Sequence, residues 1–471
     1  MKKKYYITTP IFYPNGRPHI GHAYNAIAAD VIARFQRAAG HSVFFLSGTD
    51  EHGKKMQQTA EKQGLTPQQL ADMNSVYFSQ MLETLNCSVD GFVRTTQEKH
   101  KQACQKFWQK MMDKGDIYLG RYEGWYSIRQ EAYYEESDTL LGDDGKRYEK
   151  ELGSPVEWQK EESYFFRLSK YEKPLLDYYE QNPHFIAPVP RRNEVISFVK
   201  AGLKDLSISR TNFCWGVPVP QDKKHVMYVW VDALTSYLSA IGFGQDDSAF
   251  NEFWPANLHV IGKDILRFHA VYWPAFLMSA GLPLPQRLFA HGFLLNRGEK
   301  MSKSVGNVVD PSQLVEKYGA DPLRYFFMRE VPFGQDGSYS DAVIINRINA
   351  DLANDLGNLA QRSLSMIAKN CKGCMPKANN FFPQDEKLLH GCEEVLERLY
   401  QYIEKQELHT ALTEIFSLIS QTNSYFAHEQ PWQLRKSDQK RFETVLYVTL
   451  EVLRRCGVML LCFMPQSAKK L

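Results

Sequence analysis

An alternation of strand and helix opens the chain and restricts the folds available to it. Residues 5–9 combine aromatic and β-branched side chains, which favour a strand, and residues 10–18 form a loop with three prolines and a glycine. Residues 19–39 place apolar side chains at intervals of three and four, and residues 43–46 are an apolar run typical of a buried strand. Two strands joined by a helix in this way predict a parallel sheet.

Two local signals mark where helices end and begin. Gly40 follows the first helical stretch and is expected at its C-terminus, where glycine is common. Thr66, Pro67 and Gln69 combine an N-cap, a first-turn proline and a capping glutamine. A second helix should therefore begin near residue 67.

Changes in composition divide the rest of the chain. Residues 1–117 carry the α/β alternation, and residues 118–220 are rich in Tyr, Glu, Gly and Pro, as expected of a separate insertion. The alternation resumes in residues 221–340, and residues 341–471 contain long amphipathic stretches. We therefore predict an α/β domain that is interrupted by an insertion and followed by an all-helical domain.

Hydrophobic patterns also place the elements of the last two segments. Short apolar runs predict two strands with a helix between them, and the final segment shows apolar residues at helical spacing. The strands are expected at residues 258–262 and 288–292 with a helix at 265–280, and the later helices at 342–369, 385–406 and 441–463.

The composition is that of an ordinary globular protein. The chain has 471 residues, which at roughly 150 per domain suggests about three domains. Hydrophobic residues make up 44% and the net charge is +2, which argues against disorder and does not by itself indicate nucleic-acid binding. The eight cysteines are dispersed, which favours reduced thiols and a cytoplasmic location. No apolar run approaches the roughly twenty residues of a membrane span, and we expect no signal or transit peptide.

The sequence His-Ile-Gly-His at residues 19–22 lies where the first loop becomes a helix. The N-terminus of a helix attracts phosphate through its backbone N–H groups, and His19 and His22 would add donors. Gly21 would allow a ligand to approach the backbone closely. An ordinary histidine-containing loop explains the same four residues, so the motif alone does not establish a phosphate site.

The sequence Lys-Met-Ser-Lys-Ser at residues 300–304 follows Gly298 in a basic loop. Lys300 and Lys303 would suit a pyrophosphate leaving group, whose charge grows in the transition state. A solvated basic loop with no ligand is the alternative interpretation of these residues taken by themselves.

The two motifs together are more specific than either one. Their letters and their order resemble the two signatures of class I aminoacyl-tRNA synthetases, and further segments are similar to methionyl-tRNA synthetases over nearly the whole chain. These segments are residues 9–16, 48–53, 228–234, 262–269 and 431–432. The resemblance implies a Rossmann-type catalytic domain with a connective insertion that binds the tRNA acceptor end, and an α-helical anticodon-binding domain. It also implies that methionine and ATP form methionyl-adenylate, whose methionine is passed to the 3′ end of methionine tRNA.

The resemblance further implies a methionine site. A methionine pocket needs a polarizable lining, because aromatic edges contact sulfur favourably by roughly 0.3–1.5 kcal/mol each. Asp50 would pair with the substrate ammonium, although an aspartate after a strand is also a common helix N-cap. Aromatic residues are also common in hydrophobic cores, so core packing is the alternative for the tryptophans. By similarity the lining comprises Ile11, Tyr13, Trp230, Ala233, Leu234, Tyr237, Ile265, His269 and Trp273.

For ATP and tRNA the resemblance assigns separate residues. Mg²⁺ would assist ATP, and Lys303 would contact the phosphates. In the helical domain Trp432 would stack on an anticodon base while Asn358 and Arg362 read base edges, although a plain amphipathic helix surface also explains the latter two. The protein is expected to act as a monomer. The ATP-binding residues would be His19, Gly21, His22, Gly262, Asp264, His291, Gly292 and Lys303.

The insertion departs from the family pattern in its cysteines. Residues 125–131 resemble a zinc knuckle of the family in which Ser127 and Gln130 stand where cysteines would be. Cys371 and Cys374 have the spacing of a ligand pair, but no second pair lies near them in the sequence. We therefore expect no structural zinc.

The sequence alone leaves three alternatives. Synthetases for valine, isoleucine and leucine hold a large editing domain in the insertion, for which residues 118–220 leave little room. A cysteine-specific enzyme would need a zinc site near its amino-acid pocket. A non-catalytic tRNA- or nucleotide-binding protein could also use this fold, because fold alone does not decide function.

Overall fold

The computed structural model describes residues 3–128, 132–150, 152–296, 299–300 and 308–471. The chain forms two compact units. The first unit comprises Met1–Pro18, Gly40–Glu83 and Ser88–Ala290, and the second comprises His19–Ala39, Thr84–Cys87 and His291–Leu471. The segment boundaries after residues 117, 220 and 340 stay predictions. Among the described residues, no helix combines the length and the apolar character that crossing a membrane requires.

A six-stranded sheet belongs to the first unit and has the order β3-β2-β1-β14-β15-β9. β1 pairs in parallel with both β2 and β14, and β2–β3 and β15–β9 are also parallel pairs. Tyr6, Ile7, Phe45 and Leu46 are fully buried, as expected of parallel strands that are covered on both faces. The strands span Lys4–Thr8 (β1), Ser42–Thr49 (β2), Gly91–Arg94 (β3), Ile186–Ala187 (β9), Leu258–Gly262 (β14) and Leu288–His291 (β15), so the strands predicted from the sequence are present.

Helices of the first unit surround an aromatic core. α4 contacts both α7 and α9, and Phe107 and Trp108 of α4 are fully buried. The capping box predicted near residue 67 is present, because the Gln69 backbone donates to Thr66 Oγ1 and the Thr66 backbone donates to Gln69 Oε1. The helices span Lys54–Lys62 (α2), Pro67–Thr84 (α3), Glu98–Asp113 (α4), Glu172–Gln181 (α5), Val189–Lys200 (α6), Val229–Ser239 (α7), Asp247–Phe253 (α8) and Trp273–Ala280 (α9).

The helix predicted at residues 265–280 is present but is not a regular α-helix over its whole length. A 3₁₀ turn covers Lys263–Ile265, a π-helical turn covers Phe268–Tyr272, and only then does α9 begin. Pro274 has no N–H to donate to the carbonyl of Ala270, and the Tyr179 hydroxyl donates to that carbonyl instead, over 2.5 Å. The prediction of a helix over these residues is therefore confirmed, but the π-helical turn inside it was not expected, and such turns are frequent at functional sites.

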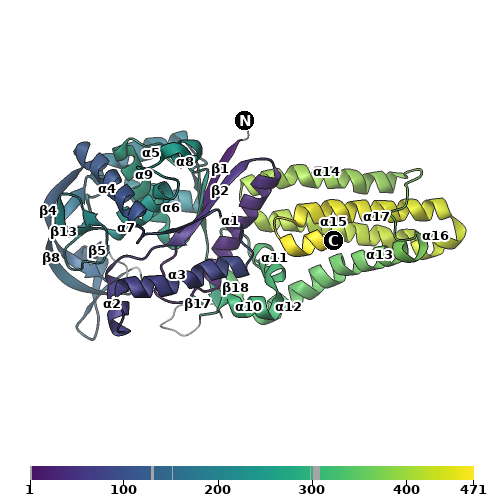
Figure 1. The fold of residues 1–471 in the computed structure, drawn as a ribbon, viewed down its shortest axis with the longest axis horizontal. Coiled ribbons are helices and arrows are strands. Elements are labelled where there is room, and N and C mark those ends of the chain that lie inside the picture. Colours follow the sequence, from purple (N-terminus) through teal and green to yellow (C-terminus); the bar gives the residue numbers. More distant parts are fainter. Residues whose placement is uncertain (1–2, 129–131, 151, 297–298, 301–307) are drawn as a thin grey trace. The chain divides into compact units, whose positions relative to one another are not determined.

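The insertion is built on a long antiparallel ribbon. β4 (Ile117–Ser127) and β8 (Pro155–Phe166) lie side by side in Figure 1 and pair from Ile117↔Phe166 to Tyr126↔Glu157. Trp125 and Trp158 face each other across the ribbon with ring centroids 5.3 Å apart, and the Arg147 guanidinium lies 4.9 Å from the Trp125 ring. Shorter strands complete this region: Ala132–Tyr134 (β5), Thr139–Leu141 (β6), Arg147–Glu149 (β7), Leu206–Ser207 (β10), Ser209–Arg210 (β11), Pro218–Val219 (β12) and Asp222–Met227 (β13).

The second unit is mainly helical. α1 (Ile20–Ala38) packs on α11 (Ala320–Glu330), where the fully buried Arg324 pairs with Asp30 at 2.7 Å and donates to three backbone carbonyls. Gly40, just beyond α1, has φ +89, as predicted for a glycine that ends a helix. The remaining elements before the bundle are Leu294–Asn296 (β16), Glu299–Lys300 (β17), Pro311–Tyr318 (α10), Gly337–Tyr339 (β18) and Asp341–Arg347 (α12).

A helical bundle forms the rest of the second unit. α14, α15 and α17 contact one another and run side by side in Figure 1. The helix predicted at residues 342–369 is divided, because a π-helical segment at Ile348–Gly357 separates α12 from α13. The bundle helices span Asn358–Asn370 (α13), Pro383–Glu404 (α14), Leu408–Glu429 (α15), Pro431–Ser437 (α16), Gln439–Leu460 (α17) and Pro465–Lys470 (α18), so the other two predicted helices are present.

Candidate functional site

Asp50 follows the carboxyl end of β2 in the first unit. Its backbone N–H donates to the Phe12 carbonyl at 2.9 Å, and its side chain is only 9% exposed. α2 begins later, at Lys54, and its N-cap is Gly53, so Asp50 is not the cap of that helix. The carboxyl ends of parallel strands are where open α/β sheets bind ligands. Asp50 is therefore placed where a ligand group could meet it.

The two residues that follow Asp50 are held firmly. Glu51 is fully buried and accepts hydrogen bonds from Arg94 at 2.7 and 3.1 Å. The Trp215 indole donates to the Glu51 carbonyl at 2.6 Å, and His52 is hydrogen-bonded to Asp232. The backbone that carries Asp50 is thus fixed by neighbours from several elements.

Aromatic rings and a neutral imidazole gather beside the N-terminus of α7. Trp230 stacks on Phe268 with centroids 3.9 Å apart, and His269 meets the Trp230 ring at 5.9 Å. The Ile265 carbonyl can only accept, so His269 Nδ1 donates to it (3.0 Å) and Nε2 accepts from the Tyr237 hydroxyl (2.8 Å). Burial lowers the pKa of His269 to about 4, which keeps this imidazole neutral at pH 7.

Asp50 belongs to the same neighbourhood as this aromatic group. Burial raises the pKa of Tyr237, and the nearby Asp50 carboxylate raises it further. Tyr237 also contacts Trp273, with ring centroids 6.2 Å apart, and Trp273 packs deep in the core against Phe107. The first unit therefore brings together one carboxylate and a set of polarizable, uncharged rings, a combination that suits a cation carrying an apolar, sulfur-containing chain.

The other expected lining residues lie on the same elements or beside them. Ala233 and Leu234 are buried on α7, and Ile11 is partly buried against the hydrophobic core that contains Leu234. Tyr13 is partly buried, and the Lys55 ammonium lies 5.4 Å from its ring. Phe268, which stacks on Trp230, was not among the expected residues, although it lies in the segment 262–269 that resembles the family.

The His-Ile-Gly-His motif at residues 19–22, in the second unit, forms the N-terminal cap of a helix. His19 is the N-cap of α1 and its Nδ1 accepts from the Gly21 backbone at 3.0 Å, while His22 Nδ1 accepts from the His19 backbone at 3.0 Å. In the neutral ring, Nε2 then carries the hydrogen. A Cβ on Gly21 would lie 2.8 Å from the His19 ring, which explains the glycine.

Four residues expected near adenosine have identifiable structural roles. Asp264 lies in the turn after β14, where a Cβ on Gly262 would come within 2.6 Å of its carboxylate. His291 Nδ1 donates to the Gly292 carbonyl at 2.7 Å, so its Nε2 accepts from the Asn25 amide at 2.8 Å. A Cβ on Gly292 would lie 2.3 Å from the Gln335 backbone, so that position requires glycine for packing.

The lysine motif is only partly within the described structure. Lys300 ends the short strand β17, which pairs with β16. Its side chain and all of Lys303 lie outside the described residues.

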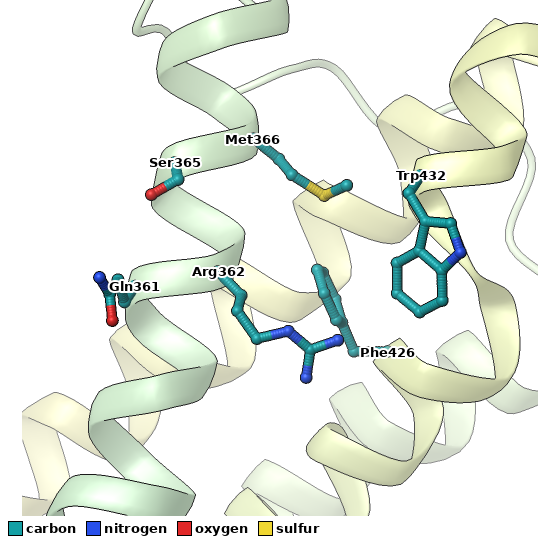
Figure 2. Close-up of a pocket in the computed structure, with 6 residues that line it drawn as sticks. All are labelled: Gln361, Arg362, Ser365, Met366, Phe426 and Trp432. Carbon is teal, nitrogen blue, oxygen red and sulfur yellow. The ribbon is translucent and has the colours of Figure 1, made fainter.

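A pocket of about 430 Å³ opens between α13, α15 and α16 in the second unit. Figure 2 shows the Arg362 side chain directed toward Phe426 and Trp432, and its guanidinium lies 5.1 and 5.8 Å from those rings. Trp432 is 42% exposed, so part of its ring can take a ligand. Asn358, the first residue of α13, is exposed and does not line the pocket. The lining consists of Gln361, Arg362, Ser365, Met366, Phe426 and Trp432.

Sequence reasoning found two of these six lining residues. Ser365 and Met366 share a face of α13 with Arg362, because they follow it by three and four residues, and Gln361 precedes Ser365 by four. That spacing is a signal that could have extended the set from Arg362. Phe426 lies far away in the sequence and nothing in its local pattern marks it.

Potential metal ligands gather at one place among the described residues. His100 and Cys104 on α4 and Asp232 on α7 lie close enough to share an ion. His100 Nε2 and Asp232 Oδ1 are 2.6 Å apart, a hydrogen-bond distance, whereas two ligands of one tetrahedral zinc ion would be about 3.3 Å apart. In the insertion, Ser127 is buried in β4, and Gln130 lies outside the described residues.

The comparisons with known proteins agree on one family. Residues 5–142 and 148–364 match the family of class I tRNA synthetases (M), and residues 375–471 match the anticodon binding domain of methionyl tRNA ligase. The methionine–tRNA ligase of Brucella suis biovar 1 is 63% identical over 470 residues, which are 100% of this chain and 91% of that protein. The methionine–tRNA ligase of Mycobacterium tuberculosis H37Rv is 57% identical over 474 residues, again 100% of this chain and 91% of the relative.

A solved structure extends the likeness to three dimensions. Mycobacterium tuberculosis methionyl-tRNA synthetase in complex with methionyl-adenylate superposes with a TM-score of 0.98 at 57% identity, covering 99% of this chain and 93% of that one. The Rossmann-type sheet with its insertion and the helical C-terminal region are thus those of the matched structure, as the sequence predicted. The chain belongs to the methionyl-tRNA synthetase family of class I tRNA synthetases.

Proposed function

We propose that this chain activates methionine with ATP, forming methionyl-adenylate and pyrophosphate, and then transfers methionine to the 3′ end of methionine tRNA. The observation that carries this proposal is the meeting of Asp50 with the aromatic and imidazole group of α7 and the π-helical turn. Membership of the family supports the reaction, and the first unit offers chemistry that matches one amino acid.

In this proposal the Asp50 carboxylate pairs with the methionine ammonium, and the rings hold the thioether. Neutral His269 suits this role, because a charged imidazole would repel the substrate ammonium. Sulfur contacts with ring edges favour methionine over an aliphatic chain of similar length. The full lining proposed is Ile11, Tyr13, Trp230, Ala233, Leu234, Tyr237, Ile265, His269 and Trp273.

ATP is proposed to use backbone and imidazole donors at the start of α1. His19 and His22 would donate from Nε2 to the phosphates, and Asp264 would accept from the ribose hydroxyls. Lys300 and Lys303 would stabilise the leaving pyrophosphate. Mg²⁺, which binds ATP largely through substrate phosphates and water, needs no dedicated protein cage and supplies charge neutralisation there. Gly21, Gly262, His291 and Gly292 would complete the ATP-binding set.

The pocket of the second unit is proposed to receive an anticodon base of methionine tRNA. Trp432 would stack on the base and the Arg362 guanidinium would reach its edge, as single-stranded RNA is commonly recognised. Asn358 would act on a neighbouring nucleotide from its exposed position. The insertion would place the acceptor end, and we propose that the protein acts as a cytoplasmic monomer.

Pyrophosphate–ATP exchange with each of the twenty amino acids tests the proposal. Exchange that depends on methionine, followed by charging of methionine tRNA, is the expected result. Exchange that depends on valine, isoleucine, leucine or cysteine would instead identify a related synthetase. Binding of tRNA without any exchange would identify a non-catalytic RNA-binding protein.

A further inference from the structure

A buried cluster of hydrogen-bonded residues connects three elements of the first unit, and the proposed mechanism does not use it. Asp232 on α7 is fully buried, and each of its carboxylate oxygens contacts an imidazole. Oδ2 lies 2.6 Å from His52 Nδ1, and Oδ1 lies 2.6 Å from His100 Nε2. His100 Nδ1 is 2.8 Å from the Ser239 hydroxyl at the end of α7, and Cys104 Sγ is 3.2 Å from His100 Nε2.

The carboxylate of this cluster fixes the orientation of both imidazoles. Burial alone would raise the pKa of Asp232, but the imidazoles of His52 and His100 lower it further than burial raises it. An ionised carboxylate only accepts hydrogen bonds, so His52 Nδ1 and His100 Nε2 must both carry a hydrogen. A charged acceptor makes both hydrogen bonds stronger than neutral ones.

His52 and Asp232 lie in segments with different tasks in the proposed methionine site. His52 lies two residues after Asp50, in the stretch that follows β2. Asp232 lies two residues after Trp230, in the first turn of α7. The His52–Asp232 hydrogen bond therefore joins the segment of the proposed ammonium partner directly to the segment of the proposed thioether lining. His100, on α4, holds the other oxygen of the same carboxylate.

Further contacts keep the Asp50 segment rigid around this hydrogen bond. The His52 ring meets the Trp215 ring edge-on at 5.3 Å, and the Gly53 backbone donates to the Trp215 carbonyl at 3.0 Å. The segment therefore has one well-defined position, in which His52 reaches Asp232 through a single short hydrogen bond. Losing that bond would remove a direct link between the segment and α7 and change the position of one relative to the other.

We propose that His52, Asp232 and His100 are positioning residues that hold Asp50 and Trp230 in fixed register and thereby set the affinity for methionine. This inference rests on the proposed methionine site. None of the three needs to touch the substrate, because their effect passes through the backbone of two neighbouring residues. Misplacing a positioned group by about 1 Å can reduce an enzyme's efficiency by about a hundredfold, so the effect should be measurable.

Three variants of the full chain test the inference. His52→Ala removes one hydrogen bond, His52→Gln offers an amide donor in its place, and Asp232→Asn removes the charge that both imidazoles share. The methionine Kd from calorimetry and the KM values for methionine and ATP in the exchange assay are the readouts. His52→Ala and Asp232→Asn should raise the methionine Kd by about tenfold or more, the loss expected from misplaced groups, with little change in the KM for ATP. His52→Gln should recover much of the affinity.

Asp116→Asn is the matched control, because Asp116 is another buried carboxylate of the first unit. It accepts from Tyr171 at 2.5 Å and from Ser279 at 2.8 Å, far along α9 from Trp273. This variant should lower the thermal midpoint as Asp232→Asn does, but leave the methionine Kd within about twofold. An equal rise of Kd in both would mean that Asp232 acts only through general stability.

The remaining outcomes also decide the question. Unchanged methionine affinity in His52→Ala and Asp232→Asn, with normal exchange by the wild type, would overturn the positioning role and leave the proposed function intact. A wild-type chain that binds no methionine would overturn both. A stoichiometric metal ion in the purified protein that disappears in Cys104→Ala would show that the cluster is a metal site and contradict the hydrogen-bonded arrangement.

Discussion

The two proposed recognition sites of this chain differ in how they use their aromatic residues. In the first unit, Trp273 and Tyr237 are fully buried and are part of the core as well as of the proposed methionine site. In the second unit, Trp432 is 42% exposed and lies at the rim of an open pocket. A small substrate can be enclosed, whereas an RNA base that belongs to a large molecule has to be met at the surface.

The two sites also differ in their charged and titratable groups. In the first unit, burial lowers the pKa of His259 and His269 and so keeps these two imidazoles neutral, and Asp50 offers a carboxylate. The second unit places the Arg362 guanidinium against two rings, where it keeps its charge for an RNA ligand. Perturbing protonation should therefore affect the two units differently, and single substitutions should affect different half-reactions.

The largest expected effect is on stability in mild acid. His269 has its pKa lowered by burial from 6.5 to about 4, so between these pH values the unfolded chain binds a proton that the folded chain does not. Stability then falls as the pH falls from about 6.5 to about 4, by about 3 kcal/mol at roughly 1.4 kcal/mol per pKa unit. His259, whose pKa burial also lowers, should add to this loss.

The second unit should respond at lower pH. Hydrogen bonds from Arg454 and Arg455 lower the pKa of Glu451 from 4.5 to about 2. The contribution of these hydrogen bonds to stability is therefore present above pH 4.5 and is lost as the pH falls through 2. Hydrogen exchange followed by mass spectrometry from pH 7 to pH 3 resolves the two units. His269→Gln should flatten the response of the first unit. If the helical bundle loses its protection against hydrogen exchange at a higher pH than the sheet does, the expected difference between the two units is wrong.

The next effect concerns methionine recognition alone. Asp50→Ala should raise the methionine KM in the exchange assay by about 10- to 150-fold, because a hydrogen bond to a charged group contributes about 1.5–3 kcal/mol. The KM for ATP should change little. Asp50→Asn, which keeps the size of the side chain, separates loss of charge from loss of packing. If the methionine KM stays at the wild-type value in both variants, Asp50 has only a structural role.

Local sequence patterns predicted the regular elements well, because burial and capping are local properties. The strand at Ser42–Thr49 and the start of α3 followed from an apolar run and from Thr66 with Gln69. The π-helical turn at Phe268–Tyr272 was not expected, because it involves Tyr179, almost a hundred residues earlier, which donates to the carbonyl that Pro274 cannot satisfy.

The same distinction between local and long-range signals applies to the residues of the candidate site. Asp50, His19 and Trp432 were proposed from motifs, because each belongs to a contiguous run of specific residues. Phe426 carries no local signal, and His52 and Asp232 lie in the specific runs 48–53 and 228–234, which do not show that the two side chains pair. Long-range pairing of this kind is visible only when the fold brings the partners together.

A smaller effect is expected from the exposed site of the second unit. Trp432→Ala should reduce kcat/KM for tRNA charging by about 5- to 150-fold, because base–aromatic stacking contributes about 1–3 kcal/mol. Adenylate formation should be unchanged, and Trp432→Phe should retain most of the charging activity. Measuring exchange and charging on the same preparations makes the comparison direct. Equal losses in the two assays would show that Trp432 supports folding, which would remove the contrast between the buried and the exposed site.

The smallest expected effect is that of removing divalent metal and restoring only Mg²⁺. Structural zinc sites take four ligands, mostly cysteine and histidine. In the described part of the insertion, Ser127 is a buried strand residue, and cross-strand pairs such as Trp125 with Trp158 hold the ribbon. Charging activity should therefore return to within about twofold of the untreated protein, as expected when no structural ligand has been lost. Stoichiometric zinc whose removal abolishes charging would contradict this. Loss of that zinc in Cys104→Ala would place it in the Asp232 cluster, and its retention would place it elsewhere in the chain.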